Sequence, residues 1–126
     1  MLRKSFIALA LLAGSTLAAN AAGDAKAGAQ VFKRCAVCHT NDKGGGDGLG
    51  PNLFGIVGRK AATHSGFAYS GPLQKSGIVW TDETLDKWLA DPQAVVPGTK
   101  MFYALESAQD RADVIEFLKQ KAGATP

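Results

Sequence analysis

Cysteine and histidine, the residues that form the disulfides of small exported proteins and bind metals, are scarce in this chain. Its 126 residues include two cysteines and two histidines. Two cysteines are too few for the disulfide framework on which many small exported proteins depend. A structural zinc site takes four ligands, so it would need both cysteines together with His39 and His64. Those histidines lie too far apart for the usual zinc-finger spacing.

Several other signals are also missing. The apolar run at residues 6–13 is too short to span a membrane. No segment alternates apolar and polar residues as a half-buried strand does, and no internal repeat is visible. The glycines at 44–46 are not followed by the Gly-Lys-Ser/Thr of a phosphate-binding loop. Since no nucleophile with a base and no acid–base pair stands out, the sequence does not favour an enzyme.

The charge balance argues against binding to nucleic acid. The formal net charge is +3, and without Arg3 and Lys4 the chain has 12 basic against 11 acidic residues. This is not a polycation, so we expect no nucleic-acid partner. Some basic residues could nevertheless form a docking face beside the motifs described below. They are Lys33, Arg34, Lys43 and Lys100.

The most informative segment that the chain does contain is Cys35-Ala36-Val37-Cys38-His39. This is the attachment signature of a c-type haem. On a turn of helix, both sulfurs can reach the vinyl groups of a porphyrin, and the adjacent imidazole can bind the iron. A thioredoxin-type redox pair is the second interpretation, but it expects a preceding strand and a βαβ pattern. A disulfide between the cysteines would close a very small loop and stabilise little.

The N-terminus has the features of a secretory signal peptide, which we expect to comprise residues 1–21 and to be cleaved. A basic start precedes the apolar core at 6–13, and Ala19-Asn20-Ala21 supplies small residues for a signal peptidase. Residues 22–126 would then form one small domain. Because c-type haem is attached outside the bacterial inner membrane, we expect a periplasmic protein. An uncleaved membrane anchor is the alternative.

We expect this domain to be all-α. Capping residues, apolar periodicity and helix stops mark three helices. They begin after Asp24, Thr81 and Ser107, and they end near Cys35, at Asp91-Pro92 and at Gly123. Glycine inside a helix costs about 1 kcal/mol relative to alanine, so Gly28 predicts a close approach of another helix. The predicted buried side chains are Val31, Phe32, Leu85, Trp88, Leu89, Val114, Ile115, Phe117 and Leu118.

A haem iron bound by His39 would have a second axial position. Met101 is the only methionine outside the signal peptide, and it follows a glycine-containing loop. We favour it over His64, because this loop can carry the sulfur across the face of the ring. A thioether favours reduced iron and so raises the potential compared with a second histidine. The carbonyl of Pro51 could accept the Nδ1–H of His39 and orient its ring, although proline is also an ordinary turn residue. Side chains with donors for the haem propionates are Arg59, Tyr69 and Trp80.

A haem would contribute much of the stability of so small a domain. Its apolar surface is roughly several hundred Å², so at about 25 cal/mol per Å² its burial contributes on the order of 10 kcal/mol. That is comparable with the whole stability of a typical domain. Isolated helices shorter than about 12–15 residues are marginal in water. We therefore expect the chain without haem to be largely unfolded.

Taken in order, these motifs resemble class I cytochrome c of the mitochondrial and soluble bacterial type. The similarity extends from Gly23 to Gly123 with the family's order and spacing. The matching segments are Cys-Ala-Val-Cys-His at 35–39, Gly-Pro-Asn-Leu at 50–53, Gly-Arg-Lys at 58–60, Gly-Phe-Ala-Tyr at 66–69, Gly-Ile-Val-Trp at 77–80 and Pro-Gly-Thr-Lys-Met at 97–101.

The resemblance implies the cytochrome c fold, with short helices and loops around one covalently bound haem c. In that fold the N- and C-terminal helices cross, here at Gly28 and Phe32. The resemblance also implies roles for individual residues: haem attachment by Cys35 and Cys38, iron ligation by His39 and Met101, support of the histidine by Pro51, and propionate contacts by Arg59, Tyr69 and Trp80.

Two positions of the haem pocket depart from the mitochondrial pattern. Trp88 stands where those relatives usually have a tyrosine near the methionine sulfur, and Leu73 where they usually have an asparagine that holds a buried water. An indole N–H donates a hydrogen bond but accepts none. A drier pocket disfavours the extra charge of ferric haem, so our hypothesis is a raised reduction potential.

Occupation of both axial positions would leave no place for a substrate on the iron. We therefore interpret the chain as a diffusible, monomeric one-electron carrier that docks transiently through the haem edge. By resemblance, its partners would be a bc1-type complex, a terminal oxidase, a peroxidase, a dehydrogenase or a photosynthetic reaction centre, with only peripheral membrane contact. The alternative is a haem peroxidase or gas sensor in which Met101 leaves the iron. Permanent attachment to one dehydrogenase is a third possibility.

Overall fold

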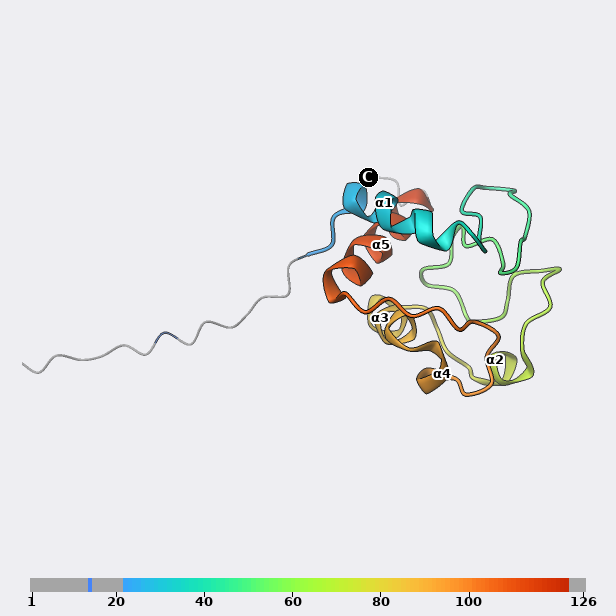
Figure 1. The fold of residues 1–126 in the computed structure, drawn as a ribbon. Coiled ribbons are helices and arrows are strands. Elements are labelled where there is room, and N and C mark those ends of the chain that lie inside the picture. The colour runs from blue at the N-terminus through green and yellow to red at the C-terminus, as the bar shows by residue number, and fades with distance from the viewer. Residues whose placement is uncertain (1–13, 15–21, 123–126) are drawn as a thin grey trace, which may run out of the picture.

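Helices and loops make up the protein wherever its structure is described. The computed structural model describes residue 14 and residues 22–122, and this part contains one isolated bridge, between Lys60 and Val79, and no strand. The helices in Figure 1 are α1 (Ala25–Cys35), α2 (Gly71–Lys75), α3 (Asp82–Ala90), α4 (Pro92–Val95) and α5 (Ala108–Lys121). The predicted all-α class is confirmed. Apart from Gly14, the predicted signal peptide lies outside the described residues.

The three long helices begin where the sequence predicts. At the start of α1, the Asp24 carboxylate accepts the backbone N–H of Lys26. Thr81 caps α3 in a reciprocal arrangement with Thr84, and the Ser107 hydroxyl accepts the N–H of Asp110 at the start of α5. These bonds satisfy donors that have no partner within the helix. The predicted stop of α5 at Gly123 lies outside the described residues. No helix among those described is both long and apolar enough to cross a bilayer.

The short helices α2 and α4 were not predicted. Each has a capping side chain, Ser70 for α2 and Asp91 for α4, followed by a proline in the first turn. Proline fits the first turn because its missing N–H would have no helical partner there. Asp91-Pro92 therefore ends α3, as expected, and also starts another turn of helix. Helices of five and four residues are too short for apolar periodicity to reveal them.

The α1 and α5 helices cross, as Figure 1 shows for the blue-to-cyan α1 and the red α5. Gly28 lies where they meet. A Cβ atom on Gly28 would overlap the carbonyl of Asp113 and would lie 2.8 Å from Cβ of Phe117. Close by, the rings of Phe32 and Phe117 are 5.3 Å apart between centroids. The predicted helix crossing is confirmed, and the glycine is explained by the space that α5 leaves.

A buried carboxylate also joins these helices. Asp113 is 6% exposed, and its Oδ1 accepts the backbone N–H of Asp24 at 2.8 Å and the Nε2–H of Gln109 at 2.9 Å. Buried charged groups need such partners to offset their lost hydration. Sequence periodicity gave no sign of this role, since Asp113 lies beside the apolar positions of α5.

The α3 helix packs on α5 through the predicted stripe of Leu85, Trp88 and Leu89, all of which are buried. Arg111 of α5 adds a polar connection. Its Nε donates to Asp86 of α3 at 2.7 Å, and its NH1 donates to the carbonyls of Leu105 and Glu106. The segment between α4 and α5 is therefore bonded to Arg111 of α5, which is itself bonded to α3.

Substituting Gly28 with alanine tests the helix crossing. We expect Gly28→Ala to lower the free energy of unfolding of the haem-loaded protein by about 1–3 kcal/mol, because overpacking forces α1 and α5 apart. Gly71→Ala is the matched control, since a Cβ there meets no atom within 4 Å, and we expect a change within about 0.5 kcal/mol. Denaturant unfolding measures both. Equal stabilities of the variants would refute this account of Gly28.

Candidate functional site

A cavity of about 700 Å³ lies between the helices and the loops. Its walls are mainly apolar, and side chains from α1, α2, α3, α5 and the intervening loops contribute to them. Every predicted site residue lines it: Cys35, Cys38, His39, Pro51, Arg59, Tyr69, Trp80, Trp88 and Met101. The structure therefore brings together residues that are 66 positions apart in the chain (from 35 to 101).

The two cysteines lie at the C-terminal end of α1. The chain turns there because the N–H groups of Cys38 and His39 both donate to the carbonyl of Cys35 at 3.0 Å. No disulfide joins the two cysteines. Burial raises the pKa of the Cys35 thiol, although the charge of Arg34 opposes the shift. Redox-active Cys-x-x-Cys pairs depend on a lowered thiol pKa, so this environment disfavours the thioredoxin-type interpretation.

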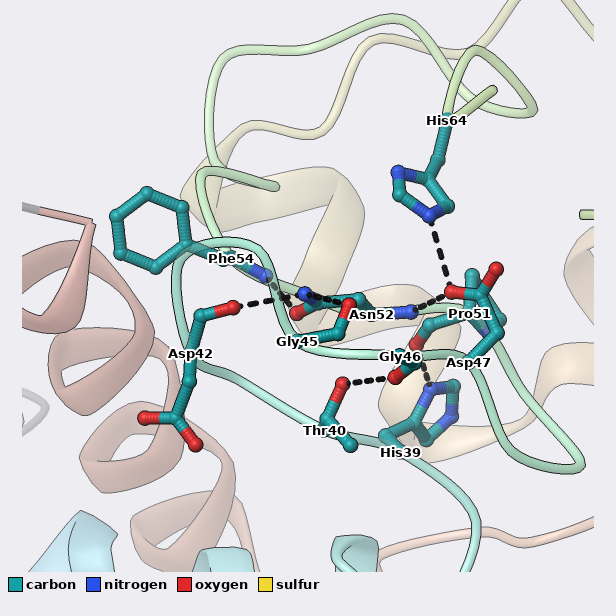
Figure 2. Close-up of polar contacts among 10 residues, drawn as sticks. All are labelled: His39, Thr40, Asp42, Gly45, Gly46, Asp47, Pro51, Asn52, Phe54 and His64. Atoms are coloured by element: carbon teal, nitrogen blue, oxygen red, sulfur yellow. Dashed lines mark hydrogen bonds and ion pairs between the residues drawn. The ribbon is translucent and has the colours of Figure 1, made fainter. Parts of the chain in front are cut away.

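The His39 ring is fixed by a backbone carbonyl. Its Nδ1–H donates to the oxygen of Pro51 at 2.7 Å (Figure 2). Burial lowers the pKa of His39, and the bond to Pro51 partly offsets this effect. A lowered pKa favours the neutral ring, whose Nε2 can act as a ligand atom. Gly50 gives this ring its space, since a Cβ there would overlap the imidazole.

The loop that carries Met101 is held by a side chain that the sequence did not point to. Gln93 of α4 donates from Nε2 to the carbonyls of Thr99 at 2.7 Å and Met101 at 3.1 Å. Thr99 is 3% exposed, and Lys100 donates from Nζ to the carbonyl of Ala68 at 2.9 Å. Met101 is half-buried and packs on the core. Its sulfur-bearing side chain is thus presented to the cavity from a fixed backbone.

Aromatic and aliphatic side chains form another part of the wall. Trp80 and Trp88 are buried and meet edge to face, with ring centroids 5.2 Å apart. Leu73 of α2 is also buried and lines the cavity. The wall is therefore apolar at the position where mitochondrial relatives usually have asparagine. Burial raises the pKa of the Tyr69 hydroxyl, while a hydrogen bond to the backbone of His64 and the charge of Arg59 lower it.

The four basic residues of the predicted docking face do not share one environment. Arg34 and Lys100 line the cavity, whereas Lys33 and Lys43 do not. Arg34 forms an ion pair with Asp110 at 2.8 Å, and this hydrogen bond raises the pKa of the guanidinium. Lys33 donates to Gln30, three residues earlier in the same helix. The charge of Arg34 is therefore partly offset, whereas Lys33, Lys43 and Lys100 form no ion pair within residues 22–122.

A polar network in the loop before Pro51 was also missed (Figure 2). Asn52 is buried, and its Nδ2 donates to the carbonyls of Asp42 and Gly45 at 2.8 and 2.9 Å. Its backbone N–H donates to Asp47 Oδ1 at 2.7 Å. His64 bonds to the same carboxylate oxygen at 2.9 Å. These contacts fold the glycine-rich segment back on itself and give it a defined shape.

The donor set does not suit zinc. Over residues 22–122, no three side chains of His, Cys, Asp or Glu come together as a metal site would require. His64 also lines the cavity, but its Nε2 is bonded to Asp47. A haem fits the residues present, because the cavity volume lies within the about 300–1,000 Å³ of cofactor pockets and its walls are mainly apolar.

Comparison with known proteins agrees with this chemistry. The sequence model of the family described as cytochrome c matches residues 25–122. This chain belongs to the cytochrome c family. Its members carry one covalently bound haem c and transfer electrons without acting as enzymes, and both statements hold for this protein. The predicted resemblance and the predicted cofactor are confirmed.

Individual relatives of this cytochrome c family member come from bacteria and eukaryotes. Cytochrome c2 of Rhodomicrobium vannielii is 50% identical over 106 residues, which cover 83% of this chain and 85% of that protein. Cytochrome c2 of Blastochloris viridis is 44% identical over 120 residues, which cover 94% of each chain. The solved structure of cytochrome cH from Methylobacterium extorquens has a TM-score of 0.73 and 44% identity, and the alignment covers 78% of this chain and 99% of that one.

Replacing Gln93 tests how the Met101 loop is held. We expect Gln93→Leu to accelerate amide hydrogen exchange at Thr99 by about tenfold or more, because two hydrogen bonds of about 1 kcal/mol each are lost. The exchange rate is measured by NMR on the reduced, haem-loaded protein. Gln120→Leu is the control, since that exposed amide has only a 3.5 Å contact with Glu116. Unchanged exchange in Gln93→Leu would contradict the role of Gln93.

Proposed function

We propose that this protein is a periplasmic one-electron carrier whose haem iron is held between His39 and Met101. The observation that carries the proposal is the meeting of Cys35, Cys38, His39 and Met101 on one apolar cavity. When bound, haem c supplies a reversible change between ferric and ferrous iron. Everything else in the mechanism depends on how the chain's own side chains hold that group.

Each of these side chains has a distinct task. The thiols of Cys35 and Cys38 would form the thioether attachments, which need a fixed turn between them. The neutral His39 ring donates to Pro51 and would present Nε2 to the iron. Gln93 steadies the backbone of Met101, whose soft sulfur favours reduced iron. Because His39 and Met101 are held by these contacts, they would keep the reorganisation that accompanies electron transfer small.

Docking would take place where the cavity reaches the surface. Three exposed side chains line the cavity, namely Val37, Leu49 and Phe102. They give the mouth of the cavity an apolar surface. Lys33, Lys43 and Lys100 would add a weak attraction that salt screens, with less from Arg34 because of Asp110. A monomer that docks briefly could exchange electrons with a bc1-type complex, a terminal oxidase, a peroxidase, a dehydrogenase or a reaction centre.

Export completes the proposal. Residues 1–21 would direct the chain across the inner membrane and would be cleaved, leaving the domain that begins at Ala22. A mature protein whose mass corresponds to this start would distinguish a cleaved signal from an uncleaved anchor.

The second candidate function is a haem peroxidase or a gas sensor in which Met101 dissociates. Its support is the glycine and proline content of residues 97–101. Against it stand the hydrogen bonds of Gln93 to this loop and the burial of Thr99. A module docked permanently to one dehydrogenase is the third possibility, and it would co-purify with that enzyme.

Carbon monoxide separates a carrier from a gas-binding protein. We expect the reduced protein to bind CO slowly or not at all, and Met101→Ala to bind it rapidly and stoichiometrically, because an axial position becomes free. Phe102→Ala is the control, since this neighbour is 80% exposed. Absorption spectroscopy follows both reactions. Rapid stoichiometric CO binding by the unsubstituted protein would support the rival function.

Leu73 tests the proposal that a dry pocket raises the reduction potential. We expect Leu73→Asn to lower the potential, because an amide or the water that it holds stabilises the extra charge of ferric haem. Leu73→Ala controls for the loss of volume. A redox titration gives both values. A potential that stays the same or rises in Leu73→Asn is the result that rejects this proposal.

A further inference from the structure

A single peptide group links His39 to a carboxylate outside the cavity wall. The carbonyl of this group, from Pro51, accepts the Nδ1–H of His39 at 2.7 Å. Its N–H, from Asn52, donates to Oδ1 of Asp47 at 2.7 Å. Figure 2 shows this chain of bonds from the imidazole through the Pro51–Asn52 peptide to the carboxylate. Both the C=O and the N–H of this conjugated peptide group are therefore hydrogen-bonded at the same time.

The carboxylate has a second partner from another segment. Nε2–H of His64 donates to the same Oδ1 of Asp47 at 2.9 Å, and both side chains are 27% exposed. The other titratable groups near this pair are Tyr69, whose pKa is affected by the backbone of His64 and the charge of Asp47, and Arg59, whose charge acts on Tyr69. Partial burial strengthens such interactions compared with those on an open surface.

We propose that Asp47 is a positioning residue that sets the donor strength of His39 through the Pro51–Asn52 peptide group, with His64 as its modulator. This inference rests on the proposed function, in which His39 binds the iron. An anionic acceptor on the N–H of a peptide polarises that peptide and makes its carbonyl a stronger acceptor, because hydrogen bonds in a chain reinforce one another.

The consequence reaches the metal ligand. A stronger carbonyl acceptor withdraws the Nδ1 proton of His39 further and makes Nε2 a better donor to iron. A better donor stabilises the ferric state, so Asp47 lowers the reduction potential. His64 donates to the same carboxylate oxygen, so it competes with the Asn52 N–H for that oxygen and weakens the effect.

The test compares Asp47→Asn with Asp42→Asn in the haem-loaded protein. Asp47→Asn keeps an oxygen acceptor for the Asn52 N–H and removes the charge. Asp42→Asn removes the same charge from the same loop, but the Asp42 carboxylate is 74% exposed, pairs with Lys121 and does not contact the peptide group. Redox titration gives the potentials, and the ¹⁵N chemical shift of His39 Nδ1 in the reduced protein reports on its hydrogen bond.

We expect Asp47→Asn to raise the potential and to move the ¹⁵N shift of His39 Nδ1 toward that of a weaker hydrogen bond, with smaller changes in Asp42→Asn. Equal potential shifts in the two variants would mean a purely through-space effect and would overturn the inference. So would an Nδ1 shift that stays unchanged in Asp47→Asn. In either case, exclusion of CO by the reduced protein would still support the carrier.

A second variant tests the modulator. We expect His64→Ala to lower the potential, because Oδ1 of Asp47 then keeps the Asn52 N–H as a partner without competition from the imidazole. An unchanged or raised potential in His64→Ala would contradict the role of His64.

Discussion

The fold depends on a flat apolar group that fills its central cavity. Within residues 22–122, direct contacts between helices are limited to α1 with α5, α3 with α5 and α3 with α4. The α2 helix packs on none of these helices, and its buried Leu73 meets the rest of the core at the cavity. The loops at residues 40–70 and 97–105 face the same space. A flat apolar group in this space therefore joins parts of the chain that otherwise have few contacts.

Around this cavity, hydrogen bonds to the backbone position the chemistry. His39 is oriented by the Pro51 carbonyl, and the Met101 loop by Gln93. Such contacts act over short distances and do not require long helices. They explain how a small domain with much irregular structure can present ligand atoms reproducibly. They also explain why glycine is needed at position 50, where the His39 ring lies directly against the backbone.

Much of this arrangement could be predicted from the sequence. The starts of α1, α3 and α5 follow from capping side chains, and the crossing of α1 and α5 from a glycine that would otherwise be unfavourable. The haem motif could be recognised from its five residues alone, since few other kinds of site use this spacing of two cysteines and a histidine. Local patterns of this kind are strong because the interactions that they report are themselves local.

Other features could not be predicted, for identifiable physical reasons. The α2 and α4 helices are too short to show periodicity. Gln93 and Asp47 act through hydrogen bonds to loop atoms, and such partners are set by the tertiary fold rather than by spacing along the chain. Asp113 is a buried carboxylate whose partners come from the start of α1 and from Gln109. The pairing of Arg34 with Asp110 likewise appears only when α1 and α5 lie together.

The most direct test of this account is the folding of the chain when no haem can be attached. Far-UV circular dichroism of a Cys35→Ala, Cys38→Ala variant, purified without haem, gives the helical content. We predict a largely unfolded chain, because the loops and α2 lose the group that joins them to the rest of the core. A native-like helical spectrum would contradict the claim that the fold depends on filling the cavity.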